Sequence, residues 1–445
     1  MRVVVLVPRR AGIADRDRLW EYVSEWWATY HPEWPVYVGE SPDGPFNRGA
    51  AINAAAREAG DWDVALVVDG DVVADPALVE QAVETAARTG RLAFPFTRYK
   101  ALGEQMTKQV LDGYAGDWSR GARTSMTTHV SSVLAVPRAL WEIVGGFDER
   151  CQGWGHDDTI FAHCCRTLGG GIERIPGTVW HLYHRPAPDA KVGKPGHRAS
   201  AHLAKRYFAA ETPAECAKLI AERDVDGVAV MVLTHGRREC IAQTIPSARE
   251  NLTGAPIIRW VICDDSDDLE YQAWLRLNFP ECELVTGKSG GFAGNVRRMW
   301  DAALGTGQEW IFWLEDDFTF NAPVDLPDLM LTMAEDSDLC QIMLKRQPWF
   351  EPELAAGGFM EMHPERYTEV RRGNRVWMEH QEGYWTNAHL TRRSFLAQHE
   401  WPKGEGSEAK FGKAVVTGPR RSAVWGRLTD PPLIHHFGER SGSGY

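Results

Sequence analysis

The stretch VVVLVPRR, residues 3–10, is a continuous run of apolar, mostly β-branched residues that ends in a proline and two arginines. Such a run is expected for a strand that is buried on both faces of a parallel sheet. A second run of the same kind, VAVMVLTHGRRE, occupies residues 228–239 and also ends in a polar turn with arginines. The chain therefore follows one plan twice.

Each half continues in the same order. An Asn-containing stretch of helical character comes first, an apolar run that ends in acidic residues follows, and a His-bearing strand closes the half. These segments are FNRGAAINAAAREAG (46–60), DVALVVDGD (63–71) and TVWHLYH (178–184) in the first half, and GGFAGNVRRMWDAAL (290–304), WIFWLEDDF (310–318) and PLIHHFG (432–438) in the second. Strands that alternate with helices predict α/β domains with mainly parallel sheets. Ligands of such sheets bind at the carboxyl ends of the strands, where both acidic clusters fall.

The length of 445 residues exceeds one ordinary hydrophobic core, so at least two domains are expected. A loop rich in Pro, Gly and Lys, HRPAPDAKVGKPGHR at residues 184–198, separates the halves, and a segment with helical spacing follows it. We predict an N-terminal domain at residues 1–204, a helical linker at 205–226 and a C-terminal domain at 227–445.

The composition excludes several classes of protein. A hydrophobic content of 44% and a charged content of 25% are typical of soluble globular proteins. The apolar run Val3–Val7 is too short for a signal-peptide core or a membrane span, so we expect a cytoplasmic protein with no membrane association. Eight scattered cysteines without a CxxC pair favour reduced thiols over disulfides or a zinc site. The net charge of −12 disfavours a large non-specific nucleic-acid surface.

The first acidic cluster, Asp69-Gly70-Asp71, is a DxD sequence at a predicted strand end. Its oxygen ligands suit a hard divalent cation that must also hold a diphosphate. His181 and His184 can approach the same site if their strand bends at its end, and imidazole ligands shift the preference toward Mn²⁺. Two alternatives stay open: Asp-Gly-Asp is a common turn, and the histidines are then a surface pair beside a loop.

The stretch GWGHDDTIF, residues 153–161, places Asp157 and Asp158 after a glycine-flanked Trp154 and before an apolar, helical-looking segment. Acidic residues at a helix N-terminus satisfy free N–H groups and the helix dipole, which is one explanation. The other is a catalytic base beside a carboxylate that binds an acceptor.

Five motifs in this order, FNRG, DGD, GGFDE, GWGHDDTIF and WHLYH, resemble the beta-1,4-galactosyltransferase family and related N-acetylgalactosaminyltransferase domains. The resemblance spans most of residues 1–190 and implies a GT-A fold, in which a Rossmann-like nucleotide-sugar half joins an acceptor half.

The resemblance also implies a role for each matching residue. The residues implied to contact uridine diphosphate are Arg9 or Arg10, Phe46, Arg48 and Asp69. The implied ligands of Mn²⁺ or Mg²⁺ are Asp71, His181 and His184, and the animal galactosyltransferases have a Met at the first histidine position. Trp154 matches a loop tryptophan that closes over the donor. Asp158 falls at the position of the family's base, and Asp157 at that of an acceptor-binding Glu.

In the second half, VMVLTHGRRE, WVICDDSDD, SGGFAGNVRRMW and WLEDDF resemble a large inverting GT-A family that includes the cellulose and hyaluronan synthases. The resemblance implies that Asp264 or Asp265 lies near the uracil and ribose, and that Asn295 and Arg298 contact the donor. Glu315-Asp316-Asp317 stands at the position of the metal-binding DxD, which makes Glu315 and Asp317 the implied ligands.

The base of the second half is less clearly marked. The stretch WPKGEGSEAKFG, residues 401–412, resembles a degenerate form of that family's acceptor motif, with Glu408 as the first candidate and Glu405 as the second. Solvated loop acids are the alternative. His435 or His436 would complete the metal site, and the spacing before FGER favours His436; a paired-His turn without a metal is the alternative.

These features predict a tandem, metal-dependent, inverting glycosyltransferase with two active sites, which moves hexose or N-acetylhexosamine from UDP-sugars to a hydroxyl acceptor. One alternative is a single-site enzyme whose degenerate second domain binds the acceptor. Another is a sugar nucleotidyltransferase, although PRRAGIADR lacks the Gly-rich signature usual after the first strand of such enzymes. A carbohydrate-binding module is the third, but binding alone needs neither a metal nor a base.

The tandem layout and the ending HFGERSGSGY are similar to glycosyltransferases encoded by actinobacterial phages. This similarity implies action in the host cytoplasm on a glycan, a virion protein or a hydroxymethylated DNA base. Duplex DNA is the weaker choice for an acidic chain, because phosphate contacts supply most non-specific affinity.

Overall fold

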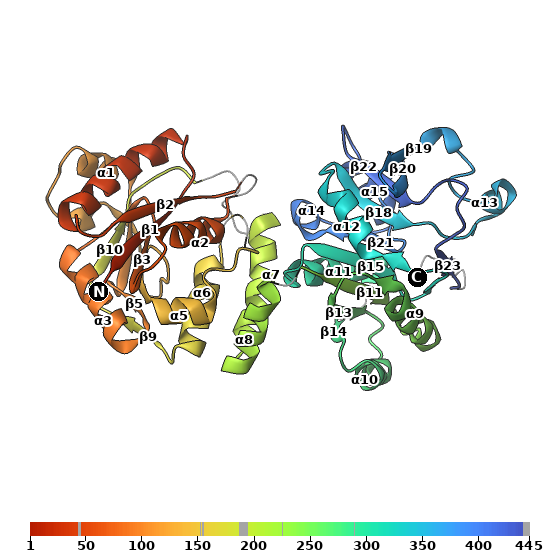
Figure 1. The fold of residues 1–445 in the computed structure, drawn as a ribbon, viewed down its shortest axis with the longest axis horizontal. Coiled ribbons are helices and arrows are strands. Elements are labelled where there is room, and N and C mark those ends of the chain that lie inside the picture. Colours follow the sequence, from red (N-terminus) through yellow and green to blue (C-terminus); the bar gives the residue numbers. More distant parts are fainter. Residues whose placement is uncertain are drawn as a thin grey trace. The chain divides into compact units, whose positions relative to one another are not determined.

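The computed structural model describes residues 1–42, 46–151, 153, 155–186, 195–224, 226–288 and 290–438. The chain divides into two compact units, Met1–Asp224 and Val225–Tyr445, which we call unit 1 and unit 2 (Figure 1). Within the described residues, no helix is both long enough and apolar enough to cross a lipid bilayer.

Unit 1 is built on a six-stranded sheet with the order β2-β1-β3-β8-β5-β9. These strands are β1 (Val3–Arg9), β2 (Val36–Glu40), β3 (Val64–Val68), β5 (Leu92–Phe94), β8 (Val133–Pro137) and β9 (Ile172–Arg174). The predicted buried strand at the start of the chain is confirmed as β1, which is parallel to β2 and β3. The sheet is mainly parallel, as predicted: β2, β1, β3, β5 and β9 run in the same direction, and β8 runs antiparallel to both of its neighbours.

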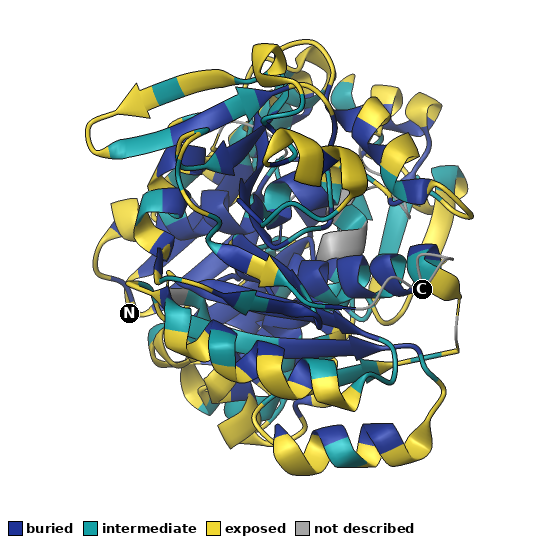
Figure 2. Ribbon diagram, turned by 90° about the vertical axis from the view of Figure 1, so that its right-hand side faces the viewer, coloured by how far each residue is buried: buried dark blue, intermediate teal, exposed yellow. Residues whose placement is uncertain are grey.

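The helices at the front of Figure 2 have both buried and exposed residues along their length, so that one side packs inward and the other meets solvent. The helices of unit 1 are likewise buried on one side only. They are α1 (Ala14–Tyr30), α2 (Arg48–Ala59), α3 (Pro76–Thr89), α4 (Glu104–Leu111), α5 (Arg138–Val144), α6 (Asp157–Leu168), α7 (Pro195–Ala209) and α8 (Pro213–Ala221). In α3, Val79, Ala82, Val83 and Ala86 are buried at helical spacing. The Asp75 side chain caps its N-terminus, so sequence and packing agree on where this helix begins.

A four-stranded sheet in unit 1 has the order β4-β10-β6-β7. Its strands are β4 (Val72–Ala74), β6 (Arg98–Leu102), β7 (Ala122–Met126) and β10 (Thr178–His181). β10 is antiparallel to β4, with His181 opposite Val72. This pairing brings the end of the His-bearing strand beside the residue that follows the Asp69–Asp71 turn.

The segment that we expected to be a linker consists largely of helices α7 and α8, which pack on unit 1. Leu203, Tyr207, Cys216 and Leu219 are buried in the core of this unit. The apolar spacing of the segment thus reflects docking onto unit 1, and the two units meet in the chain after Asp224.

Unit 2 is built on a nine-stranded sheet with the order β14-β13-β11-β15-β21-β18-β22-β20-β19. These strands are β11 (Val228–Thr234), β13 (Ile257–Asp264), β14 (Glu283–Thr286), β15 (Trp310–Glu315), β18 (Leu339–Leu344), β19 (Thr368–Arg372), β20 (Arg375–His380), β21 (His389–Arg392) and β22 (Arg421–Trp425). The helices are α9 (Arg238–Asn251), α10 (Leu269–Asn278), α11 (Gly291–Gly305), α12 (Leu326–Ala334), α13 (Glu351–Ala356), α14 (Arg393–Gln398) and α15 (Ser407–Val415). Two short strand pairs, β12 (Leu252–Thr253) with β17 (Val324–Asp325) and β16 (Phe318–Phe320) with β23 (Ile434–His436), complete the unit.

The repeat seen in the sequence is also a repeat of topology. The strands β13-β11-β15-β21-β18-β22 follow the same order and the same relative directions as β2-β1-β3-β8-β5-β9 in unit 1. The antiparallel pair β16–β23 corresponds to β4–β10. Equivalent positions of the two units can therefore be compared directly.

Candidate active sites at the strand ends

In unit 1 the turn between β3 and β4 brings Asp71 to His181, the last residue of β10, and to His184, which follows that strand. The Nε2 atom of His184 lies 3.1 Å from Oδ2 of Asp71, and Nε2 of His181 lies 3.6 Å from Oδ1. One ligand atom from each residue lies within 4.8 Å of the other two. Among the described His, Cys, Asp and Glu side chains, no other group of three or more converges in this way. The donor set and spacing fit a divalent cation such as Mn²⁺.

The charges within this cluster keep Asp71 ready to bind a cation. Burial alone would raise the pKa of Asp71, but His181 and His184 hold it well below its usual range. Burial lowers the pKa of His184, but the hydrogen bond and charge of Asp71 outweigh this and raise it. The carboxylate is therefore ionised, and a bound cation would displace the proton of the His184 imidazole.

Arg48, the first residue of α2, joins the DGD turn to the acidic start of α6. Its Nε donates to Asp69 Oδ1 at 2.8 Å, and its Nη1 donates to Asp157 Oδ2 at 2.9 Å. Burial lowers the pKa of Arg48, but Asp69 and Asp157 outweigh that effect and raise it. Asp69 also accepts a hydrogen bond from the Ser132 amide at 3.1 Å. The carboxylate of Asp69 is therefore bonded to Arg48 and Ser132, whereas that of Asp71 faces the two histidines.

The two acids of GWGHDDTIF lie in different environments. Asp157 is paired with Arg48, whereas Asp158 accepts a hydrogen bond from the Thr159 amide at 2.7 Å. Burial and the neighbouring charge of Asp157 raise the pKa of Asp158 to about 6. A carboxyl whose pKa is raised by burial and a neighbouring charge is suited to take up a proton near neutral pH. Asp158 also lies in the first turn of α6, as the helix-start explanation of the motif expects.

The residues expected to contact a nucleotide lie at the carboxyl ends of β1 and β2. The Arg10 guanidinium lies over the Phe46 ring, 5.7 Å from its centroid, and donates to Ser41 Oγ at 2.9 Å. Arg9 is instead paired with Asp17. Of the two arginines left open by the sequence, Arg10 is the one that packs with Phe46. Trp154 lies outside the residues that the structure describes.

Three further residues, Arg16, Tyr99 and His129, lie near this cluster, and no sequence motif predicted them. Nη2 of Arg16, on α1, lies 3.3 Å from Nδ1 of His184. The Tyr99 ring packs against the rings of His181 and His129. Burial, with the charges of His181 and Arg48, lowers the pKa of His129 to about 4. No short motif marks these residues, because each is brought to the site by strand pairing or helix packing over a long sequence separation.

In unit 2 the acids that follow β15 meet the first turn after β11. Asp316 accepts a hydrogen bond from Thr234 Oγ1 at 2.5 Å and is paired with Arg237. Asp317 Oδ2 accepts from Arg237 Nη1 at 2.9 Å and lies 3.3 Å from Nε2 of His436. Of the two histidines left open by the sequence, His436 is therefore the one that faces the acids.

The implied metal ligands of unit 2 are not gathered as those of unit 1 are. Ligand atoms of Glu315, Asp317 and His436 do not all lie within 4.8 Å of one another among the described residues. The guanidinium of Arg237 is bonded to Asp317 instead. In this arrangement the three residues do not form a gathered set of cation ligands, and Arg237 is bonded to the acids.

Glu408 occupies the position in unit 2 that Asp158 occupies in unit 1. Each is the second residue of the helix that lies between equivalent strands, and each helix follows a residue of positive φ, 66° at Gly406 and 74° at His156. The Glu408 carboxylate accepts from the amide and the hydroxyl of Thr386 at 2.8 and 2.9 Å. Burial raises its pKa.

Glu408 also lies close to the acids of the strand end. Burial and the charge of Asp317, with a further contribution from Glu408, raise the pKa of Glu315 to about 8. Glu405, the second candidate for a base, is exposed. The structure therefore places Glu408, and not Glu405, beside the acidic cluster.

Of the remaining predicted residues of unit 2, Asp264 and Asp265 lie at the carboxyl end of β13, and Asn295 and Arg298 lie on α11. Asp265 is paired with His235 at 2.7 Å, and Asp264 accepts from Ser266 Oγ at 2.9 Å. The Asn295 amide is buried and donates to the Thr234 carbonyl at 3.0 Å, which fastens α11 to the end of β11. The guanidinium of Arg298 donates to the Lys288 carbonyl at 2.7 Å.

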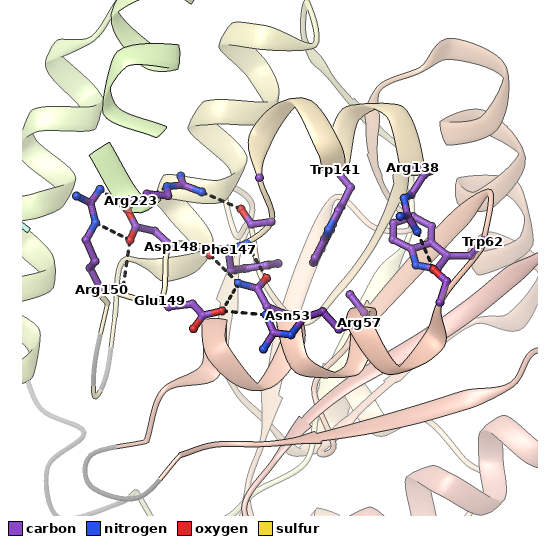
Figure 3. Close-up of a pocket in the computed structure, with 14 residues that line it drawn as sticks. Asn53, Arg57, Trp62, Arg138, Trp141, Phe147, Asp148, Glu149, Arg150 and Arg223 are labelled. Atoms are coloured by element: carbon purple, nitrogen blue, oxygen red, sulfur yellow. Dashed lines mark hydrogen bonds and ion pairs between the residues drawn. The ribbon is translucent and has the colours of Figure 1, made fainter. Parts of the chain in front are cut away.

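A separate cavity of about 640 Å³ lies in unit 1 beside α2 and α5 (Figure 3). None of the predicted site residues lines it. Its polar groups bond to one another: the Asn53 amide donates to the Phe147 carbonyl at 2.9 Å, and Asp148 is paired with Arg150 and Arg223. The GGFDE motif thus has a structural use, since Asp148 also accepts from the Tyr207 hydroxyl of α7 at 2.8 Å.

No family model matches the chain, and no curated protein matches it. Among solved structures it is similar to the catalytic domain of Drosophila beta1,4galactosyltransferase 7 in complex with xylobiose, with 20% identity over 41% of this chain and 71% of that chain, and a TM-score of 0.27. It is also similar to S. aureus TarS, with 16% identity over 47% of this chain and 36% of that chain, and a TM-score of 0.33. GalNAc-T7 with UDP, GalNAc and Mn2+ has 10% identity, 58% coverage of both chains and a TM-score of 0.37. Because these scores are low, inferences about function depend on the geometry of the two clusters.

Proposed function

We propose that the chain is a GT-A-type glycosyltransferase that moves a sugar from a UDP-sugar donor to a hydroxyl acceptor. The observation that carries the proposal is the continuity of the site in unit 1. Asp71 faces His181 and His184 on one side, and the adjoining Asp69 is linked through Arg48 to the acidic start of α6. A cation site and a candidate base therefore belong to one cluster at the carboxyl ends of the strands, where ligands of such sheets bind.

The residues of unit 1 divide the chemistry between them. Asp71, His181 and His184 would hold Mn²⁺ or Mg²⁺, which when bound neutralises the charge that develops on a departing diphosphate. Arg10 and Phe46 present a cation and an aromatic face for the nucleotide. Asp158 takes the proton of the acceptor hydroxyl as it attacks, because a hydroxyl is a poor nucleophile near neutral pH.

Other residues position these groups or act on the acceptor. Asp157, held by Arg48, binds the acceptor. A single in-line displacement inverts the configuration at the anomeric carbon.

The test of this function is a donor panel. UDP-glucose, UDP-galactose and their N-acetyl forms are each incubated with the full chain and Mn²⁺, and hydrolysis and thermal shift are measured. We expect one or more donors to be hydrolysed slowly and to stabilise the protein, and EDTA to remove the hydrolysis. If no UDP-sugar shows either effect while a nucleoside triphosphate and a sugar phosphate react, the nucleotidyltransferase alternative is correct.

The transfer catalysed by unit 1 should lose rate in mild acid. Only the deprotonated Asp158 accepts a proton, and its pKa is raised to about 6. The rate should therefore be constant above neutral pH and fall as the pH drops through about 6, approaching a tenfold loss per pH unit. The pH profile of kcat/KM at saturating Mn²⁺ measures this, and a profile that is flat down to the ordinary range of a carboxyl would contradict it.

We propose that unit 2 is a second transferase site with Glu408 as its base. Its position equivalent to Asp158 and its closeness to Glu315 support this role. The pairing of Arg237 with the acids favours the alternative, in which unit 2 has lost catalysis and binds the acceptor. The proposed acceptors are a glycan, a virion protein or a hydroxymethylated base. Each has a hydroxyl group to which a sugar can be transferred, whether one unit or both units are catalytic.

A further inference from the structure

The acidic clusters of the two units have different counter-ions. In unit 1 the oxygens of Asp71 face two imidazoles, and the guanidinium of Arg16 lies behind His184. In unit 2 a guanidinium is bonded directly to the acids. We infer that Arg237 is an internal counter-ion of unit 2, which competes with a divalent cation for Asp316 and Asp317 and excludes it until an anion draws the guanidinium away.

The contacts of Arg237 are those of a strong ion pair. Nη1 donates to Asp317 Oδ2 at 2.9 Å, Nε donates to Asp316 Oδ2 at 3.3 Å, and Nη2 is bonded to Asp316 Oδ1. The side chains of Asp316 and Asp317 are only 0% and 6% exposed. Two adjacent carboxylates at this depth need a compensating cation, and the planar fork of an arginine binds both.

One oxygen of the acidic pair is not used by this arrangement. Oδ1 of Asp317 is buried and has no hydrogen-bond partner within the described part of the chain, whereas Oδ2 contacts both Arg237 and His436. Space around Asp317 is kept by Gly438, where a Cβ atom would lie 2.2 Å from Oδ2. The carboxylate therefore keeps capacity for a cation, although Arg237 holds its other oxygen.

Competition for the same carboxylates couples two binding events. A cation can bind Asp316 and Asp317 only when the Arg237 guanidinium has moved away from them. A diphosphate can draw the guanidinium away, because an arginine binds such an anion well through two parallel hydrogen bonds. By linkage, each ligand then raises the affinity for the other by the same factor. Unit 1 binds a cation without nucleotide, whereas unit 2 binds it together with a diphosphate. That the anion is a diphosphate rests on the proposed function. That Arg237 excludes the cation rests only on its contacts with Asp316 and Asp317.

The test counts bound Mn²⁺ by electron paramagnetic resonance on the full chain, in an Asp71→Asn background that greatly weakens the cation site of unit 1. Without nucleotide, a further Arg237→Gln change should raise the affinity of unit 2 for Mn²⁺ about ten- to a hundredfold, the range of a charge-assisted pair. The matched control is Arg238→Gln. Arg238 is the next residue and lies over the Trp274 ring, so its loss should leave Mn²⁺ binding unchanged. Added UDP should raise Mn²⁺ affinity in the Asp71→Asn protein and much less after Arg237→Gln.

Equal Mn²⁺ affinity with and without Arg237, in the absence of UDP, would overturn the inference. If the Arg237→Gln protein does not fold, the unsubstituted chain provides the test: one Mn²⁺ bound without nucleotide and two with UDP support the inference, and two without nucleotide refute it. Failure of the proposed function can be told apart from failure of this inference. If only the proposed function is wrong, Arg237→Gln still raises Mn²⁺ affinity without nucleotide, but no UDP-sugar is hydrolysed.

Discussion

Asp158→Asn should abolish sugar transfer by unit 1 while the protein still binds its donor. Asparagine has nearly the shape of aspartate but cannot accept the proton of an attacking hydroxyl. General base catalysis commonly contributes about 10²- to 10⁴-fold, so we expect kcat/KM to fall by about a thousandfold or more, equivalent to about 4 kcal/mol of transition-state stabilisation. Transfer kinetics and calorimetric binding of UDP with Mn²⁺ measure the two effects separately.

Asp157→Asn is the matched control for this variant. Asp157 lies one residue away and is held by Arg48, in the position proposed for acceptor binding. Its replacement should raise the KM for the acceptor more than it lowers kcat. Near-normal turnover by Asp158→Asn, or an equal loss of turnover in both variants, would remove Asp158 from the role of base.

Asp71→Asn should greatly weaken Mn²⁺ binding in unit 1 and remove most of its transfer activity. The substitution removes the only carboxylate of the three candidate ligands and with it the charge that raises the pKa of His184. A metal ion contributes several kcal/mol of charge stabilisation, so donor hydrolysis by unit 1 should fall by about a thousandfold or more. Hydrolysis assays across a Mn²⁺ titration measure this, and activity that is restored only by a large excess of Mn²⁺ is the expected residual behaviour.

Asp317→Asn is the equivalent change in unit 2 and shows whether that unit transfers a sugar. If both units are active, each variant should stop one sugar addition and spare the other. An unchanged product pattern after Asp317→Asn would mean that unit 2 is not catalytic. Unchanged transfer after Asp71→Asn would contradict the proposed cation site itself.

Local patterns predicted the strands and the acids at their ends. The β-branched runs before Arg9 and Thr234 identify buried strands because an uninterrupted apolar run suits a strand covered on both faces. The DGD turn and the Asp157-Asp158 pair were predicted as candidate site residues for a similar reason, since strand ends and helix starts have short sequence signals. Their grouping into one cluster is a property of the fold.

Contacts between distant parts of the chain could not be predicted in this way. Arg16 and His184 are 168 residues apart, and Arg237 lies 79 residues before Asp316. Arginines in polar turns are common, and only packing decides which carboxylate they meet. The same holds for the segment after residue 205, whose apolar spacing predicted helices but could not tell that they dock on unit 1.

The attachment of α7 and α8 to unit 1 decides where the molecule can be divided. Asp148 is fully buried, and its charge is balanced partly by Arg223 and by the hydroxyl of Tyr207. A fragment that ended at the predicted domain limit of residue 204 would lack both partners, and breaking a buried ion pair of this kind costs about 3–5 kcal/mol. A first half that folds by itself must therefore include α7 and α8. If the chain is divided in two for separate expression, the division belongs near Asp224.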